Sequence, residues 1–193
     1  MKETIFGTIA FILFMVYDLE QAGAVSHRFH KMTKFFFTIA SVILAAATVS
    51  LLWKSNIFVT VWTGKTVFSL VLAVLFFALL IYTLFFALPF EETYVAQDAH
   101  KTYDKKMYAL CRHPGVLWFA GFYICLWLAF GTKPLLAMAI WFSFLNFCYV
   151  VLQDHYTFPR IFSDYGDYQK RVPFLIPNGK SLKRCMDTFK ESR

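Results

Sequence analysis

The feature that most constrains this chain is an unbroken apolar run at residues 67–90, where 24 consecutive positions carry no charged side chain. A helix of about 20 apolar residues is long enough to cross the hydrocarbon core of a bilayer. The composition agrees, because 59% of the 193 residues are hydrophobic and only 16% are charged, whereas soluble domains carry roughly 25% charged residues. The sequence therefore predicts an all-α, multi-pass membrane protein of one domain.

Four further apolar runs predict the other helices, at 4–17, 35–53, 115–130 and 134–152. The second and the fourth have 19 residues each and are long enough to span a bilayer. The first and the third are shorter, and are typical either of half-spans or of helices in a soluble-type core. A tight turn at 131–134 separates the last two runs, so we expect 115–152 to form a helical hairpin. The prediction is about five transmembrane helices, the last two in a hairpin, and a short cytoplasmic C-terminal segment.

The distribution of Lys and Arg predicts the orientation of the chain. With five spans, the segments 18–34, 91–114 and 153–193 lie on one side of the membrane, and they hold 15 of the 19 basic residues. Basic residues are enriched in cytoplasmic loops, so we expect the N-terminus outside and the C-terminus and the active site in the cytoplasm. The net charge of +7 suits anionic lipid head groups. We therefore expect membrane lipids and no nucleic acid as partners, and the oligomeric state is left open.

The character of the chain changes at residue 91. Residues 1–90 contain three predicted helices with few polar side chains, and we interpret them as a scaffold. Residues 91–178 alternate polar segments with helices and are interpreted as the functional part, and residues 179–193 as a basic tail. The four cysteines show no C-x-x-C spacing, so we expect neither a bound metal nor disulfide bonds.

The first polar cluster is the Arg112-His113-Pro114 triplet at the start of the predicted hairpin. Pro114 suits the first turn of a helix, where a missing N–H does no harm. Arg112 and His113 then lie where free backbone N–H groups favour anions. Arginine offers a planar fork for a carboxylate or phosphate, and histidine exchanges a proton near neutral pH. The alternative is that Arg112 is a positive-inside anchor and His113 only caps a helix.

The second polar cluster is Gln153-Asp154, at the other end of the predicted hairpin. A short hairpin brings its own ends together, so we expect this pair beside Arg112 and His113. The Asp154 carboxylate suits an ammonium group, a ribose hydroxyl or a sulfonium. The alternative is an ion pair of Asp154 with Arg112 or Arg160 that only stabilises the fold.

A third group of candidate residues follows the hairpin. Tyr165 and Tyr168 are three positions apart, so they share one face if this segment is helical. The proline-containing segment 172–177 is predicted to be extended, because proline breaks a helix and restricts the residue before it. Within this segment, Phe174 is expected either to lie across a pocket or to anchor in the lipid boundary.

Taken in order, these residues resemble the membrane-embedded methyltransferases typified by isoprenylcysteine carboxyl methyltransferase, with the phospholipid methyltransferases as relatives. That family shows a Tyr four residues before an Arg-His-Pro triplet, then a helical hairpin, an acidic pair and a Y-x-x-Y…VP…P tail. The chain carries the corresponding residues at Tyr108, Arg112-His113-Pro114, 115–152, Gln153-Asp154, Tyr165, Tyr168, Val172-Pro173 and Pro177. It departs from the pattern twice: Gln153-Asp154 replaces a Glu-Glu pair, and Val116-Leu117 replaces a common Tyr-Gly.

The resemblance implies a methyltransferase that binds S-adenosylmethionine at the cytoplasmic end of the hairpin. It implies that Arg112 and His113 contact the methionine carboxylate of this cofactor. It also implies that Asp154, together with Gln153, contacts the amino group or the ribose. The other residues assigned to the cofactor are Tyr108, Tyr165 and Tyr168 around the nucleoside, Pro173 and Phe174 closing over it, and Pro114 of the triplet.

The methyl acceptor implied by the resemblance is a lipophilic small molecule or a lipidated group, such as a prenyl-cysteine carboxylate or a phospholipid amine. The catalytic candidates are Arg112, His113, Asp154 and Arg171. Arg171 would guide an anionic acceptor, or else it is a cation that extends to the membrane surface. Two other interpretations stay open. One is an NADPH-dependent membrane reductase of related fold, and the other is a non-catalytic membrane subunit or ligand carrier in which Arg112 and Asp154 form a structural pair.

Overall fold

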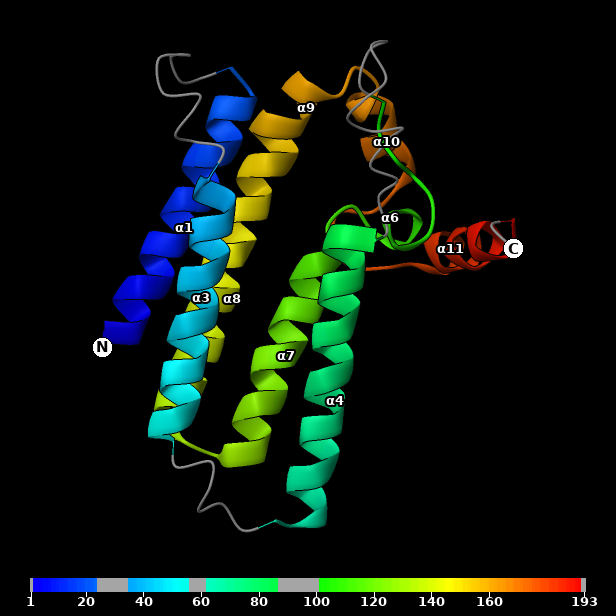
Figure 1. Cartoon of the computed structure of the whole chain (residues 1–193). Helices are drawn as coiled ribbons and strands as arrows, with labels where there is room; N and C mark the ends of the chain where they lie inside the picture. The colour runs from blue at the N-terminus through cyan, green and yellow to red at the C-terminus, as the bar shows by residue number, and fades with distance from the viewer. Residues whose placement is uncertain (1, 24–34, 56–61, 87–100, 192–193) are drawn as a thin grey trace.

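The computed structural model describes residues 2–23, 35–55, 62–86 and 101–191, and these residues form helices without any strand (Figure 1). The long helices of the bundle are α1 (Lys2–Gln21), α3 (Phe36–Lys54), α4 (Gly64–Ile81), α7 (Pro114–Phe130) and α8 (Lys133–Leu152). The shorter helices are α6 (Met107–Leu110), α9 (Phe158–Ile161), α10 (Tyr165–Arg171) and α11 (Gly179–Glu191). Two π-helical turns, η2 (Tyr82–Phe86) and η3 (Gln153–Thr157), prolong α4 and α8. The all-α prediction is confirmed for the described residues.

Three helical segments of the described chain are long and apolar enough to cross a membrane: Phe36–Lys54, Gly64–Phe86 and Lys133–Ile161. Large apolar side chains point outward on them, as lipid contact requires; on α4, Phe68 is 65% and Val74 is 69% exposed. The helix α7 is also apolar but has only 17 residues, and α1 has 20 residues with acidic side chains near both ends. The described helices are therefore compatible with a membrane protein, and the count of five spans stays a prediction.

The long helices alternate in direction, so their first and last residues gather at the two ends of the bundle (Figure 1). At one end α1, α4 and α8 finish and α3 and α7 begin. The helix α1 packs against α3 and α8, and α4 packs against α7. Gly131 and Thr132 join α7 to α8, which pack against each other. Gly131 adopts a φ of 66°, and its N–H bonds to the carbonyl of Trp127, the left-handed cap that glycine favours.

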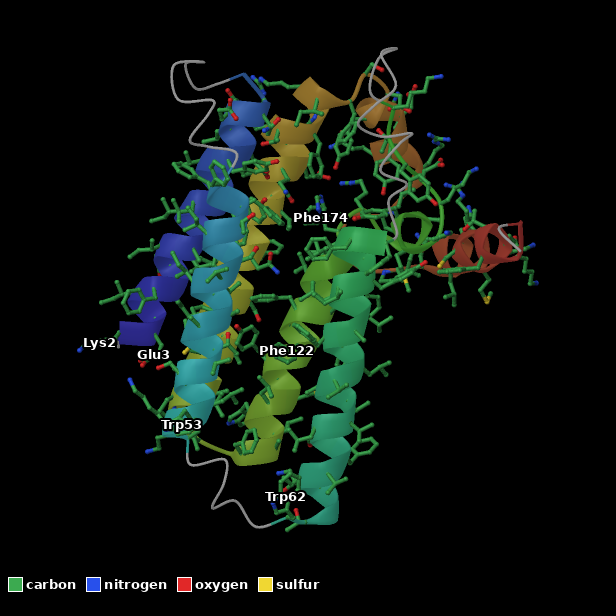
Figure 2. All side chains as sticks on the ribbon, in the orientation of Figure 1. Lys2, Glu3, Trp53, Trp62, Phe122 and Phe174 are labelled. Atoms are coloured by element: carbon green, nitrogen blue, oxygen red, sulfur yellow. The ribbon has the colours of Figure 1, made fainter. Side chains whose placement is uncertain are left out.

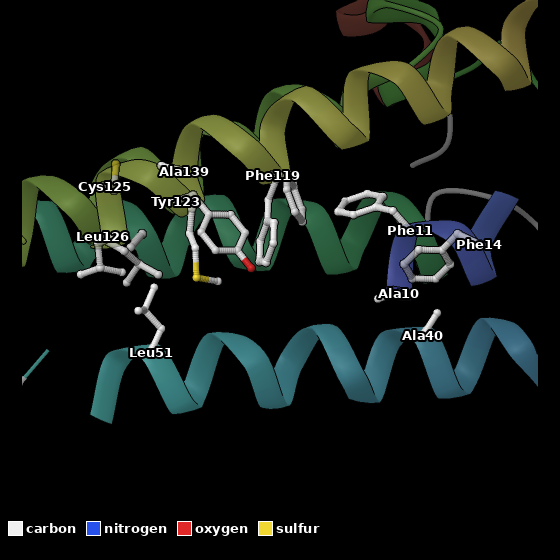
Figure 3. Packing of buried hydrophobic residues seen from close by; sticks show 14 residues of the cluster. Ala10, Phe11, Phe14, Ala40, Leu51, Phe119, Tyr123, Cys125, Leu126 and Ala139 are labelled. Atoms are coloured by element: carbon white, nitrogen blue, oxygen red, sulfur yellow. The ribbon is translucent and has the colours of Figure 1, made fainter. Parts of the chain in front are cut away.

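An aromatic core holds the centre of the bundle together (Figure 3). Phe11, Phe119, Tyr123 and Phe142 are buried, and the centroids of contacting rings lie between 4.9 and 6.3 Å apart. The close approach of α1 to α8 requires Gly7, because a Cβ at this position would overlap the Phe142 ring. Small residues at such crossings let helices pack closely in apolar surroundings.

Two helix boundaries differ from the sequence prediction. The helix predicted over 67–90 begins at Gly64, and its last four positions lie outside the described residues. The helix predicted to end at 152 instead continues through η3 and α9 to Ile161, with Pro159 in the first turn of α9. A π-helical turn inserts an extra residue and so rotates the side chains that follow it around the helix. The polar pair that begins at Gln153 therefore lies within a helix and not in a loop.

Candidate functional site

Polar residues from several parts of the chain converge on the carboxylate of Asp154, which is 1% exposed and lies in η3. Nε of Arg112 donates to Oδ1 of Asp154 over 2.7 Å, and Nη2 donates to Oδ2 over 2.9 Å. This two-pronged geometry is that of strong arginine–carboxylate pairs. The structure thus brings together Arg112, which precedes the start of α7, and Asp154, which follows the end of α8.

Three other side chains complete the surroundings of the Asp154 carboxylate. His113 Nε2 lies 3.1 Å from Oδ1, and the Tyr165 hydroxyl donates to Oδ1 over 2.7 Å. Gln169 Nε2 donates to Oδ2 over 3.1 Å and to the backbone carbonyl of Asp154 over 3.0 Å. A carboxylate has about four acceptor positions. The donors of the chain itself therefore fill the acceptor capacity of Asp154.

Arg112 also fixes the segment that follows α10. Its Nη1 donates to the carbonyl oxygens of Gln169 and Val172 over 3.0 and 2.8 Å, and its backbone N–H donates to the carbonyl of Pro173 over 2.9 Å. The centroid of the Phe174 ring lies 5.5 Å from Cζ of Arg112, within reach of a cation–π interaction. The guanidinium has five N–H donors, and these bonds use all but one N–H on Nη2.

His113 lies between two aromatic rings. Its ring centroid is 5.8 Å from that of Phe158, nearly parallel to it, and 5.2 Å from that of Phe174. Figure 2 shows Phe174 toward the opposite end of the molecule from Trp62. Burial lowers the pKa of His113, although the Asp154 carboxylate opposes this effect, so the neutral imidazole is favoured. Because a carboxylate only accepts hydrogen bonds, Nε2 of His113 is the donor to Asp154 and Nδ1 is the acceptor atom of the ring.

The tyrosines of α10 support the site from the other side. Tyr165 and Tyr168 are each 2% exposed and lie on one face of the helix, as their spacing predicts. The Tyr168 hydroxyl donates to the carbonyl of Tyr108 over 2.8 Å, and the Tyr108 hydroxyl donates to the carbonyl of Thr83 over 3.1 Å. Burial raises the pKa of Tyr165 and of Tyr168, so both hydroxyls keep their protons. These bonds connect α10 to α6, and α6 to the end of α4.

Three further residues of the predicted site do not hydrogen-bond to the Asp154 carboxylate. Gln153 Nε2 donates to Asp18 of α1 over 2.7 Å, because neighbouring residues of a helix point about 100° apart. Arg171 is half-exposed and pairs with Asp104 over 3.2 Å, so it lies outside the set of residues that contact Asp154. Pro114 occupies the first turn of α7, as predicted, and is buried there.

Two residues of the site are absent from the sequence prediction, and a third residue, Thr157, lies next to one of them in the chain. Gln169 lies four positions after Tyr165, and this helical spacing is the signal that marks it. Phe158 follows a π-helical turn, for which the sequence gives no comparable signal. Thr157 Oγ1 is buried, and it has no hydrogen-bond partner in the part of the chain that the structure describes.

No protein-family model, curated protein or solved structure matches the chain. Within residues 2–23, 35–55, 62–86 and 101–191, no group of three or more His, Cys, Asp or Glu side chains is placed to hold a metal ion. The site combines a fixed guanidinium, a buried neutral imidazole and aromatic rings. Such a set is suited to an organic ligand that carries an anionic group next to apolar surface.

Proposed function

We propose that the chain is an integral-membrane methyltransferase that uses S-adenosylmethionine to methylate a lipophilic acceptor. The supporting observation is the convergence of Arg112, His113 and Asp154 with Tyr165 and Phe174 at one end of the bundle. These are residues on which the resemblance to the isoprenylcysteine carboxyl methyltransferases rests, and they come from separate parts of the chain. A structural ion pair requires only an arginine and an aspartate, so the additional aromatic and imidazole groups favour a binding site.

The proposal places α1, α3, α4, α7 and α8 across the membrane, with the last two as a helical hairpin. The N-terminus then lies outside, and the Asp154 site lies at the cytoplasmic face. In support, Lys170, Arg171 and the basic residues of α11 follow the site in the chain, and basic residues are enriched on the cytoplasmic side. A water-soluble cofactor would reach the site from the cytosol and a lipophilic acceptor from the bilayer.

In this proposal the residues of the site hold the cofactor in a different way from the one that the resemblance implies. Asp154 has no acceptor capacity left for an ammonium group, so we assign it to positioning Arg112, His113 and Tyr165. The remaining N–H on Nη2 of Arg112 would hold a polar group of the cofactor. Bound S-adenosylmethionine supplies an electrophilic methyl group. The contribution of the chain is to fix the two reactants in place, which can lower the barrier of a bimolecular reaction by about 7–11 kcal/mol.

His113 is the residue placed to handle a proton. Its imidazole is neutral because burial lowers its pKa, and its Nδ1 is free of the bond to Asp154. If the acceptor is an amine or a thiol, Nδ1 would take the proton that the acceptor loses. If the acceptor is a carboxylate, no proton is released, and His113 would only orient the ligand. His113 would therefore act as a base for an amine or thiol acceptor, and only as a binding residue for a carboxylate acceptor.

Calorimetric titration with S-adenosylhomocysteine, using the purified full chain in lipid nanodiscs, tests this proposal. We expect binding to the wild type and a loss of binding in His113→Ala. His155→Ala is the matched control, because His155 is a neighbouring histidine whose side chain is 72% exposed, and it should bind like the wild type. Each variant must also keep the melting temperature of the wild type, so that a folding defect is not mistaken for a binding defect.

A second candidate function, a non-catalytic membrane subunit, is favoured by one observation. The donors of the chain fill the acceptor positions of Asp154, so this carboxylate is left no position for a ligand. This candidate predicts that neither S-adenosylhomocysteine nor NADPH binds the wild type. Binding of NADPH alone would instead favour a membrane reductase. Mass spectrometry of a lipid extract incubated with methyl-labelled cofactor then identifies the acceptor.

A further inference from the structure

The C-terminal segment, which the sequence presents as a basic tail, forms the helix α11 outside the bundle. Figure 1 shows α11 running sideways, across the direction of α4 and α7, near the end of α4. It packs on α6, where the buried Cys185 contacts Ala109 and Leu110. Thr188 Oγ1 accepts a hydrogen bond from the backbone N–H of Lys106 over 2.9 Å. One side of α11 is therefore firmly attached to the rest of the protein.

A second side of α11 is apolar and faces away from the protein. Leu182 and Met186 are four positions apart and so lie on one face of the helix. They are 50% and 51% exposed, whereas Ser181 and Cys185 on the attached side are buried. We call Leu182 and Met186 the apolar strip. These two neighbouring side chains form a small exposed apolar surface beside the docked face.

The charged residues of α11 are arranged around the apolar strip. Lys183 and Lys190 are seven positions apart, which places them on one line along the helix, and this line borders the strip on the side away from α6. Lys180, Arg184 and Asp187 are exposed and lie on the opposite side of the helix from the strip. An exposed apolar face bordered by lysines is the pattern of helices that lie in the surface of a membrane.

The position of α11 relative to α4 agrees with this pattern. Trp118, which packs against the same cluster as Cys185, donates from Nε1 to Thr83 Oγ1 over 3.1 Å. Thr83 lies near the end of the apolar segment Gly64–Phe86, which is long enough to cross a membrane. The cluster that holds α11 is therefore level with the end of a span, where the head groups of the bilayer begin.

We propose that α11 is an interfacial helix that binds the surface of a bilayer containing anionic lipids. The apolar strip enters the boundary of the acyl chains, and Lys183 and Lys190 extend to anionic head groups at its edge. This inference rests on the membrane placement in the proposed function and is independent of methyl transfer. Its test needs no cofactor, so the two proposals can fail separately.

Spin-label depth measurement on the full chain tests the placement of the apolar strip. The labels are introduced at Met186→Cys and, as the matched control one residue away, at Asp187→Cys. The background is Cys148→Ser, because Cys148 is the one cysteine of the four that is not buried. The vesicles contain phosphatidylcholine and phosphatidylglycerol. We expect the ratio of collisions with oxygen to collisions with a water-soluble nickel complex to be several-fold higher at 186 than at 187.

Equal and high collision rates with the nickel complex at both positions would overturn the proposal, since the strip would then face water. Low collision rates with both relaxing agents at 186 would also overturn it, because a second protein copy would then cover the strip.

The lipid preference is tested with two charge-matched pairs, Lys183→Gln/Lys190→Gln and Lys180→Gln/Arg184→Gln. We expect the first pair to weaken association of spin-labelled phosphatidylglycerol by about fivefold per lysine and the second pair to have little effect. An equal effect of both pairs contradicts a specific basic edge.

Discussion

At one end of the bundle Glu3 of α1 accepts hydrogen bonds from Lys54 and Ser50 of α3, and at the other end Asp154 accepts hydrogen bonds from Arg112 and three further side chains. The cations of the two ion pairs differ in exposure. The Lys54 side chain is 58% exposed and the Arg112 side chain is 11% exposed. The same kind of chemical interaction therefore occurs once at an open edge of the protein and once in its interior.

The two pairs also differ in the segments that they connect. The Glu3 pair joins α1 to α3, which already pack against each other. The Asp154 site joins η3 to the start of α7, to α10 and to the extended segment after α10. Burial and the number of segments joined, and not the presence of an ion pair, indicate which charged residues organise the molecule. This difference leads to four predictions about stability.

The largest effect is expected for Asp154→Ala. The substitution leaves the Arg112 guanidinium buried without its carboxylate, and breaking a buried pair in this way costs about 3–5 kcal/mol. The measurement is the free energy of unfolding of the purified chain in detergent micelles. Asp167→Ala is the control, because the Asp167 side chain is 73% exposed and pairs with the exposed Lys170, and it should leave stability nearly unchanged. Similar unfolding of the two variants would contradict an organising role for Asp154.

A smaller effect is expected for Tyr165→Phe, which removes one donor to the Asp154 carboxylate. Hydrogen bonds to charged groups contribute about 1.5–3 kcal/mol, and those between neutral groups about 0.5–1.5 kcal/mol. Tyr168→Phe is the matched comparison, because Tyr168 is equally buried and donates to a neutral carbonyl. We expect Tyr165→Phe to lower the melting temperature more than Tyr168→Phe, and the reverse order would contradict the proposed importance of the carboxylate.

Much of the architecture around Asp154 can be predicted from the sequence. Long apolar runs without charged residues predict the long helices. A helix that contacts lipid on one face and the protein core on the other has no position that favours a charged side chain. The tight turn at 131–132 implies that α7 and α8 run in opposite directions, so residues at their far ends, Arg112 and Asp154, lie close together. The Tyr165 and Tyr168 spacing correctly predicts a shared buried face. These inferences depend on chain geometry alone.

The remaining features depend on interactions that a linear pattern does not display. Asp154 faces Arg112 while Gln153 faces Asp18, although the two residues are neighbours in the sequence and the resemblance implies that they act together. The saturation of Asp154 depends on Gln169, which becomes a neighbour only when α10 folds back. In α11 the many basic residues conceal an apolar pattern that begins at Leu182, so net charge alone predicts a tail where helical spacing predicts an amphipathic helix.

The third prediction concerns pH and His113. Burial lowers the pKa of His113 in the folded chain, Arg112 and His155 act in the same direction, and Asp154 opposes them. A histidine in an unfolded chain takes up a proton at about pH 6.5. Just below this pH, His113 is therefore protonated in the unfolded chain and still neutral in the folded chain. The contribution of neutral His113 to stability is therefore complete above about pH 6.5. It is lost as the pH falls from there toward the pKa of the folded state.

The difference in unfolding free energy between the wild type and His113→Gln, measured from about pH 8 to about pH 5, isolates this contribution. We expect the wild type to lose more stability than the variant over this interval. His155→Gln is the control, since His155 is largely exposed and is the weakest of the named influences on the pKa of His113, and its replacement should change the slope much less than His113→Gln does. A wild type and a His113→Gln variant with parallel pH profiles would contradict a neutral, buried His113.

The smallest effect is expected at the other end of the bundle, for Lys54→Met. The Lys54 side chain is largely exposed, and ion pairs with an exposed partner contribute about 0–1 kcal/mol. A double-mutant cycle with Glu3→Gln isolates the pair itself, because it removes the separate effect of each substitution on packing. Ser50 continues to donate a hydrogen bond to position 3 in Lys54→Met, so Glu3 is not left without a partner. A coupling energy between Glu3 and Lys54 as large as the loss of unfolding free energy in Asp154→Ala would contradict this expectation. Both ends of the bundle would then organise the fold equally, and the exposure of a charged residue would be a poor guide to its role in this protein.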